Sequence, residues 1–458
     1  MSRLVVVSNR VALPQQSRAG GLAVALDDAL KATGGLWFGW SGKGTRDGTR
    51  GLHTAEAGSV QYVTMDLTEP EVAGYYDGFS NRTLWPALHY RLDLVEYSRD
   101  THVVYRQVNA RFAERLAGLL QPGDRVWIHD YHLLPLAAEL RARGVRNPMG
   151  LFLHVPFPPS DLARALPNHA SVFGAMAAYD LLGFQTERDR ENFDAYLRDA
   201  TGSGELDARS ARPLPRTQAF PISIDAGEFA GIATRARSSP GYRSLRNSLG
   251  ESQLAIGVDR LDYSKGLPEK FQAFGEFLRR YPDQAGRLTL LQVAPVSRGA
   301  VRSYRELRHE LERIAGHING EYSNPQWTPI RYVNRNFGRQ AVAGFYAASR
   351  LGLVTPLRDG MNLVAKEFVA AQDPDDPGVL VLSRFAGAAE QLRGAVLVNP
   401  HDTGGVADAI ATALAMDVGE RRERHADSLR TLTDHDIHWW ADTFLQALGE
   451  ATGSAKAS

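Results

Sequence analysis

The sequence predicts an α/β protein built from two doubly wound, Rossmann-like domains. Short apolar runs rich in β-branched residues recur along the 458 residues, and most of them precede an amphipathic helical pattern. Continuous apolar strands that alternate with helices are typical of parallel sheets covered on both faces. The runs form two series, each long enough for one such sheet, and the polar stretch 233–253 between them has no strand character.

The first series of expected strands begins near the N-terminus with the apolar run LVVV. Helical patterns follow several of its members, for example at 22–33 and 187–201. These strands predict an N-terminal domain over residues 1–235. The five expected strands are 4–7, 125–130, 150–155, 181–186 and 220–224.

The second series predicts a C-terminal domain over residues 236–435. It is followed by an expected amphipathic helix at 436–450 and by a polar tail, 451–458, that we expect to be disordered. The six expected strands are 254–259, 288–294, 329–333, 350–354, 378–383 and 395–400.

The composition excludes several classes of protein. Lys plus Arg equals Asp plus Glu, at 52 each, so no net charge attracts the chain to nucleic acid or to an anionic membrane. The absence of cysteine excludes disulfides and thiolate metal sites. The apolar run near the N-terminus has four residues, too few for a signal peptide or a membrane span. We therefore expect a cytoplasmic enzyme with local anion-binding clusters.

Ligands of open parallel sheets bind beyond the carboxyl ends of the strands, so the residues there are the first candidates. Arg10 ends the first expected strand, and Gly20 and Gly21 open a helix with free amides that favour an anion. Asp130 follows the second strand and His154 ends the third. The alternatives are a solvated Arg, a simple Gly-Gly turn and a core histidine. The two histidines of HDYH fit a polar pocket wall better than a metal site.

Cations follow two strands of the second series. Arg260 and Lys265 stand between a strand and a helix, where Arg supplies a bidentate fork and Lys a point charge for a diphosphate. Arg298 follows the next strand. An exposed charged loop is the alternative. Cations at several strand ends of a neutral chain favour one or two small anionic ligands.

The stretch TPLRDGMNLVAKEF connects an expected strand to an expected helix. The amides of residues 361–364 should be free to bind a diphosphate at the helix N-terminus. Glu367 lies about 1.5 turns further and could accept two ribose hydroxyls, while Asp359 could accept from a sugar. The alternative is an N-capping Asp and a surface Glu.

Three aromatic residues are placed by the sequence in loops. Trp40, Tyr76 and Trp85 either belong to a satellite core or form a wall for a sugar ring. The chain has no P-loop, no nucleophile elbow, no HExxH and no GxGxxG after the first strand.

Taken together, these motifs resemble the trehalose-6-phosphate synthases, a family of retaining glucosyltransferases with the GT-B fold. The resemblance covers about residues 3–445 with the motifs in order. It implies two Rossmann-like domains that face each other across a cleft, and a last helix, 436–450, that crosses back to pack on the first domain. The motifs include VVVSNR, AGGLAV, GLWFGWSG, YYDGFSN, WIHDYHL, FLHVPFP, VDRLDYSKGLPEK and TPLRDGMNLVAKEF.

The resemblance implies transfer of glucose from UDP-glucose to glucose-6-phosphate, giving α,α-trehalose 6-phosphate and UDP. Front-face attack is implied, with Arg260 and Lys265 in place of a metal and no cofactor required. The catalytic set would be Asp130, His154, Arg260, Lys265 and Asp359. The acceptor would contact Arg10, Trp40, Tyr76, Trp85, Asp130 and Arg298. The donor would contact Gly20, Gly21, His154, Arg260, Lys265, Phe337, Asp359, Leu363, Val364, Ala365, Lys366 and Glu367.

Two rival functions stay open at this stage. A related synthase would use another phosphorylated acceptor such as glycerol 3-phosphate, although the aromatic wall favours a sugar ring. A catalytically silent sugar-phosphate sensor would be expected to lack the clamp and ribose residues, which are present here. The sequence does not determine whether the donor nucleotide is UDP, ADP or GDP. It does not determine the oligomeric state either, and both a dimer and a tetramer are compatible with it.

Overall fold

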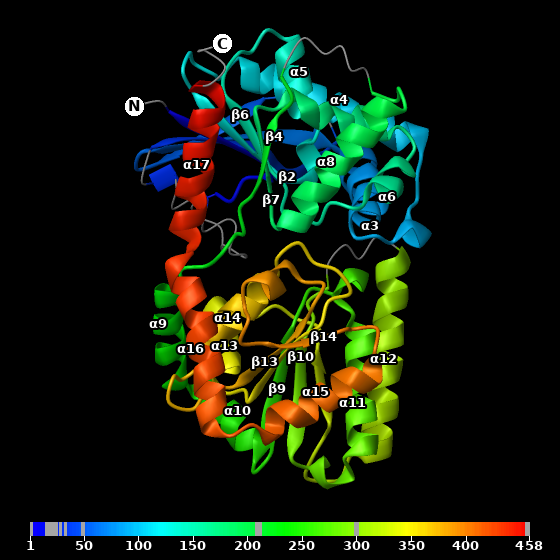
Figure 1. Cartoon of the computed structure of the whole chain (residues 1–458), viewed down its shortest axis with the longest axis vertical. Helices are drawn as coiled ribbons and strands as arrows, with labels where there is room; N and C mark the ends of the chain where they lie inside the picture. Colours follow the sequence, from blue (N-terminus) through cyan, green and yellow to red (C-terminus); the bar gives the residue numbers. More distant parts are fainter. Residues whose placement is uncertain are drawn as a thin grey trace. The chain divides into compact units, whose positions relative to one another are not determined.

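The computed structural model describes residues 3–13, 26, 30–31, 34–46, 51–206, 213–296 and 302–453. It divides into two compact units (Figure 1). The first contains Met1–Pro221 and His438–Ser458, and the second contains Ile222–Ile437. The expected domain boundary at 235/236 is therefore too late in the chain. It would cut helix α9 (Ala226–Arg237), which packs on helices of the second unit.

The first unit contains an eight-stranded sheet with the order β3-β4-β2-β1-β5-β6-β7-β8. All neighbours are parallel except β3 and β4, which form a hairpin. The strand order reverses between β1 and β5. The strands are β1 Leu4–Arg10, β2 Gly35–Thr45, β3 Leu52–Ala57, β4 Val60–Thr68, β5 Arg125–His129, β6 Met149–Phe152, β7 Leu181–Phe184 and β8 Arg216–Ala219.

Helices cover this sheet, and one of them returns from the end of the chain. Helix α17 (Ile437–Gly453) places Phe444 flat against Trp127 of β5, with ring centroids 4.8 Å apart. Glycines make room for it, since a Cβ on Gly150 or Gly183 would lie 2.8 or 2.7 Å from the Phe444 ring. The other helices are α2 Glu69–Glu71, η1 Val72–Leu84, α3 Trp85–Leu88, η2 Leu92–Leu94, α4 Arg99–Ala117, η3 Tyr131–Leu133, α5 Leu136–Ala142, α6 Ser160–Arg164, α7 His169–Val172, η4 Gly174–Ala178 and α8 Glu187–Gly202.

The second unit contains a six-stranded, fully parallel sheet with the order β11-β10-β9-β12-β13-β14. Counted along the chain this is 3-2-1-4-5-6, the Rossmann order, with its reversal between β9 and β12. The prediction of two Rossmann-like parallel sheets is confirmed. The strands are β9 Gln253–Val258, β10 Leu288–Val293, β11 Ile330–Val333, β12 Leu351–Val354, β13 Val379–Ser383 and β14 Val396–Val398.

Two groups of helices pack on the second sheet (Figure 1). Helix α11 contacts α12 and α15 in one group, while α9, α13, α14 and α16 form the other. No helix in the described ranges has an apolar stretch long enough to cross a membrane. The helices are α9, α10 Pro240–Leu249, η5 Tyr263–Lys265, α11 Leu267–Arg280, η6 Pro282–Gln284, α12 Arg302–Tyr322, α13 Arg339–Ala347, α14 Leu363–Ala371, η7 Gly387–Glu390, α15 Thr403–Ala415 and α16 Val418–Asp434.

Several sequence-based expectations are wrong in detail. The strand expected at 220–224 is not formed: β8 ends at Ala219, and Pro221 has no N–H with which to continue a ladder. The segment around Trp40 is the long strand β2 and not a loop, and Trp85 begins helix α3. Residues 451–453, expected in the disordered tail, are the end of α17, and residues 454–458 lie outside the described residues.

Candidate functional site

Arg10 stands at the strand-order reversal of the first sheet, where β1 ends. It is exposed, and its guanidinium carbon lies 4.7 Å from the centroid of the Trp40 ring and 5.4 Å from that of Tyr76. Trp40 is its neighbour across the β1–β2 ladder and is itself fixed by a hydrogen bond from Nε1 to the Lys43 carbonyl, 2.8 Å. Contact with aromatic faces orients a guanidinium and leaves its N–H groups able to bind an anion.

A continuous series of rings extends from Trp40 along this edge of the sheet. Trp40 meets Tyr76 edge-on, with centroids 5.5 Å apart, and Tyr76 stacks on His132 at 5.7 Å. His132 contacts Tyr131, which in turn contacts Trp85 at 5.6 Å. Tyr76 belongs to the π-helix η1, a rare conformation that is frequently found at functional sites. The three predicted sugar-wall residues are thus joined through Tyr131 and His132.

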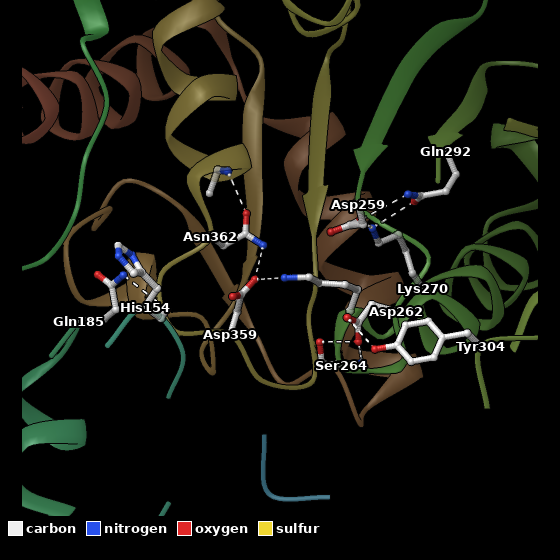
Figure 2. A network of polar contacts seen from close by, with 12 residues as sticks. His154, Gln185, Asp259, Asp262, Ser264, Lys270, Gln292, Tyr304, Asp359 and Asn362 are labelled. Atoms are coloured by element: carbon white, nitrogen blue, oxygen red, sulfur yellow. Dashed lines mark hydrogen bonds and ion pairs between the residues drawn. The ribbon is translucent and has the colours of Figure 1, made fainter. Parts of the chain in front are cut away.

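Asp130 and His154 follow neighbouring strands and contact each other. The Asp130 carboxylate accepts a hydrogen bond from the His154 backbone N–H, 3.3 Å. Asp130 has φ 74°, a left-handed value that is rare outside glycine and is often found at functional sites. The Gln185 side chain donates to the His154 carbonyl, 3.4 Å (Figure 2). The ring of His154 lies 3.1 Å, Nε2 to Nδ1, from that of His129.

Burial keeps this histidine pair uncharged. It lowers the pKa of His154 to about 3, and it lowers the pKa of the fully buried His129 well below its usual range. Both rings are therefore neutral at physiological pH. Of the other predicted residues on this side, Gly20 and Gly21 lie outside the described residues, as does Arg298 of the second unit.

In the second unit an ion pair joins the two loops that flank the β9–β12 reversal. Lys265 Nζ, after β9, lies 2.5 Å from Asp359 Oδ2, after β12, and the side chains are only 12% and 14% exposed. Asn362 donates from Nδ2 to the same carboxylate oxygen, 2.9 Å, as Figure 2 shows. Two residues that were predicted separately, Lys265 and Asp359, thus lie with Asn362 in one compact polar cluster.

The backbone of the two loops is held together beneath this cluster. Leu357 N donates to Ser264 O, 2.9 Å. Gly266 has φ 62°, and a Cβ there would lie 2.6 Å from the Thr355 carbonyl, so only glycine permits this approach. Asp262 caps the loop by accepting from Ser264 N, 3.0 Å (Figure 2). Arg260, exposed in the same loop, therefore stands on a fixed backbone.

Helix α14 starts later than predicted. Asn362 is its N-cap, with φ 81°, and its Oδ1 accepts from Ala365 N, 3.3 Å. Met361 and Asn362 therefore precede the helix, and the first-turn amides are those of Leu363 and Val364 together with the capped Ala365. The positive end of the helix dipole still points to the Lys265–Asp359 cluster through Asn362.

Glu367 and Lys366 follow one another on α14 but have different surroundings. Burial raises the pKa of the half-buried Glu367 to about 7, and Tyr346 donates to its Oε2, 3.4 Å. Lys366 is fully buried and donates to Ile222 O and to Gln391 Oε1, both 2.6 Å. Its amine is therefore directed into the unit, so this residue can serve a ligand only through its backbone.

Phe337 lies in the loop after β11. Its ring packs edge-on against Phe345 of α13, with centroids 5.0 Å apart, and Arg335 lies over it at 4.7 Å. These contacts do not join it to the Lys265–Asp359 cluster. A role for its backbone in binding a base stays a prediction.

Comparison with known proteins identifies the family. Residues 3–450 match the model of glycosyltransferase family 20. The chain belongs to glycosyltransferase family 20. It is 47% identical over 461 residues to a trehalose-6-phosphate synthase of Enterobacter sp. (strain 638), covering 99% of this chain and 96% of that protein.

Two solved structures that are similar to this chain contain bound ligands. A UDP-forming α,α-trehalose-phosphate synthase from Burkholderia xenovorans in complex with glucose-6-phosphate is 43% identical, with TM-score 0.93 over 98% of this chain and 100% of that one. A structure described as trehalose-6-phosphate from E. coli bound with UDP-2-fluoro glucose is 48% identical, with TM-score 0.91 over 98% and 99%. The resemblance to trehalose-6-phosphate synthases is confirmed.

Sequence reasoning missed three polar features of this family 20 chain. Asn362 could have been found as a cap residue before an apolar helix. Lys270 of α11 is buried with Asp259 at 2.7 Å and Gln292 at 3.1 Å (Figure 2), and its place on the apolar face of α11 was the available signal. The contact of His129 with His154 had no sequence signal. Within the described ranges, no three His, Asp or Glu side chains are grouped to hold a metal ion.

Proposed function

We propose that the chain transfers glucose from UDP-glucose to glucose-6-phosphate with retention, giving α,α-trehalose 6-phosphate and UDP. The observation that carries this proposal is the cluster of Lys265, Asp359 and Asn362 at the β9–β12 reversal, in a chain so similar to the proteins bound to glucose-6-phosphate and to UDP-2-fluoro glucose. Rossmann-type sheets bind phosphorylated ligands at such a reversal.

The first unit would bind the acceptor. Arg10, with Arg298 of the second unit, would bind the phosphate of glucose-6-phosphate through charge-assisted hydrogen bonds. Tyr76 and Trp85 would line the sugar ring, Trp40 would orient Arg10, and the Asp130 carboxylate would accept from sugar hydroxyls. The ring contacts of Arg10 support this assignment because they hold its guanidinium at the strand end.

The second unit would bind the donor. Arg260, Lys265, Gly20 and Gly21 would surround the diphosphate together with the backbone of Leu363, Val364 and Ala365. Glu367 would accept from the ribose hydroxyls, Asp359 from the glucose, and the Phe337 backbone would contact the uracil. His154 of the first unit would contact the glucose. The helix start at Leu363 supports the diphosphate position, because unpaired amides and the helix dipole both favour an anion there.

We propose that the transfer is a front-face reaction. The bond from the anomeric carbon to the diphosphate oxygen breaks and the bond to the acceptor oxygen forms on the same face. The acceptor proton passes to the departing diphosphate oxygen, so no carboxylate has to serve as nucleophile or base. The negative charge that grows on UDP is stabilised by Lys265, Arg260 and the first amides of α14. We propose that these groups replace a divalent metal and that no cofactor is required.

A matrix of nucleotide-glucose donors and phosphorylated acceptors tests the proposal directly. We expect UDP release that requires both UDP-glucose and glucose-6-phosphate, a product with the mass of trehalose 6-phosphate, and an unchanged rate in EDTA. Activity with glycerol 3-phosphate alone would overturn the acceptor. Loss of the rate in EDTA, restored by Mg²⁺, would overturn the metal-independent mechanism. A chain that binds glucose-6-phosphate but releases no nucleotide would be a sensor.

Localisation and assembly follow from the same proposal. We place the activity in the cytoplasm, where sugar phosphates and nucleotide sugars are both present. A homodimer or homotetramer is compatible with the proposal, and size-exclusion chromatography with light scattering measures the assembly directly.

A further inference from the structure

We propose that His129 is a positioning residue that fixes the tautomer of His154, so that His154 offers an Nδ1–H donor to its ligand. The identity of that ligand as the transferred glucose rests on the proposed function. The tautomer itself rests on contacts within the first unit.

The two rings share one hydrogen. His129 Nδ1 and His154 Nε2 are 3.1 Å apart, so one nitrogen donates and the other accepts. Burial lowers the pKa of both side chains, which excludes a charged ring that would donate from both nitrogens. Two arrangements are left. Either His129 donates from Nδ1, or His154 donates from Nε2.

The surroundings of His129 decide between them. The residue is 1% exposed, and its Nε2 has no hydrogen-bond partner among the described residues. If His154 were the donor, neutral His129 would carry its hydrogen on Nε2, as a buried N–H without an acceptor. Buried N–H groups without an acceptor are rare in proteins, whereas an acceptor without a donor is somewhat more common. His129 therefore donates from Nδ1, and His154 accepts at Nε2 and keeps its hydrogen on Nδ1.

Aromatic packing restricts the movement of both histidine rings. The His129 ring lies 4.7 Å from Trp127 and 6.4 Å from Trp440 of α17. Trp440 also contacts the ring of His154 at 6.2 Å, and Phe152 contacts it at 4.6 Å.

The backbone of His154 is fixed as well. Its N–H donates to Asp130 and its carbonyl accepts from Gln185. Among described residues, Nδ1 is the one polar atom of this half-buried histidine that has no hydrogen bond. Its N–H is therefore available to a lone pair of a sugar hydroxyl, and it needs no protonation step.

Nitrogen NMR of the ¹⁵N-histidine-labelled, ligand-free chain at neutral pH tests the tautomer. The spectrum of His154→Gln identifies the His154 signals. We expect a protonated-type shift at Nδ1 and an unprotonated-type shift at Nε2. The same pattern should persist in His129→Asn, whose amide N–H replaces the Nδ1–H donor. His129→Phe, of similar shape but without a donor, should show a mixture of tautomers. A hydrogen on His154 Nε2 in the wild-type chain would overturn the proposal, whether or not the variants fold.

Kinetics of the same variants test the consequence. His129→Phe should lower kcat/KM for UDP-glucose by about 5- to 10-fold, as expected for one neutral hydrogen bond, with the KM for glucose-6-phosphate unchanged. His129→Asn should restore most of the loss, whereas equal losses in both variants would contradict a donor role. If the chain uses another donor sugar, the proposed function fails while the NMR result stands, so the two failures are distinguishable.

Discussion

Each sheet has a strand-order reversal, and a cation stands at both, but the two cations are held in different ways. At the β1–β5 reversal an exposed Arg10 lies over the rings of Trp40 and Tyr76. At the β9–β12 reversal a largely buried Lys265 is paired with Asp359. Topology decides where a ligand binds, and the side chains on the loops decide which ligand it is.

The surroundings of each cation suit the phosphate group that it would bind in the proposed reaction. Aromatic faces leave the charge of Arg10 available to an acceptor phosphate whose charge stays constant during the reaction. Negative charge that grows on a leaving diphosphate would strengthen the interaction of that diphosphate with Lys265 at the moment of transfer. With the proposed function, the first reversal would contribute ground-state binding and the second would contribute transition-state stabilisation.

The largest effect is expected from Lys265→Met. The substitution removes a cation from the diphosphate and leaves the Asp359 carboxylate to repel it, so kcat/KM should fall about 10²- to 10³-fold. Lys265→Met with Asp359→Asn should recover part of the loss, because the repulsion is removed. UDP release at saturating glucose-6-phosphate measures both. Arg279→Met, at an exposed cation of α11 paired with Glu276, is the control and should keep the wild-type rate. Wild-type kinetics in Lys265→Met would show that Lys265 does not stabilise the transition state, which would contradict the proposed difference between the two reversals.

A smaller and different effect is expected from Arg10→Gln. Loss of a charge-assisted contact with a bound phosphate should raise the KM for glucose-6-phosphate about 10- to 100-fold. The KM for UDP-glucose should stay within about twofold if the two reversals bind separate substrates. Initial rates with each substrate varied in turn separate the two constants. A parallel rise in both would show that Arg10 does not belong to the acceptor alone.

The smallest effect concerns the pH dependence of stability in the second unit. Folding raises the pKa of Glu367 from 4.5 to about 7, so its contribution to stability is lost as pH rises through this interval. Folding lowers the pKa of Lys366 from 10.5 to about 7, so stability is gained as pH rises from about 7 to 10.5. Their combined contribution is lowest near pH 7.

Melting curves of two variants separate these contributions. Glu367→Gln should flatten the acid limb of the Tm profile, and Lys366→Met should flatten the alkaline limb. Glu310→Gln, at an exposed carboxyl of α12, is the control and should leave both limbs unchanged. Profiles of the two variants that run parallel to the wild type would show that neither group changes its protonation on folding.

The sequence was most informative where one physical effect dominates. The buried runs at Leu351–Val354 and Val379–Ser383 are strands because continuous apolar residues require a sheet covered on both faces. Strand β2 was missed because its Trp and Gly residues resemble a loop, although its place beside β1 buries both tryptophans. The start of α14 was expected about two residues too early, near residue 361, because the Asn362 side chain caps the helix.

Side-chain partners at the site were less predictable. That Lys265 and Asp359 flank one reversal follows from strand order, so their proximity was foreseeable. The burial of the Lys366 amine could not be foreseen, because its acceptors, Ile222 and Gln391, are distant in sequence. The same holds for His129, whose role depends on a helix that returns from residue 437.

A crystal structure of the chain with UDP tests most directly whether the protein's own cations and amides receive the departing nucleotide. We predict that diphosphate oxygens lie within hydrogen-bond distance of Lys265 Nζ, the Arg260 guanidinium and the amides at the start of α14. A diphosphate bound elsewhere, or one that reaches the protein only through a divalent metal, would contradict it.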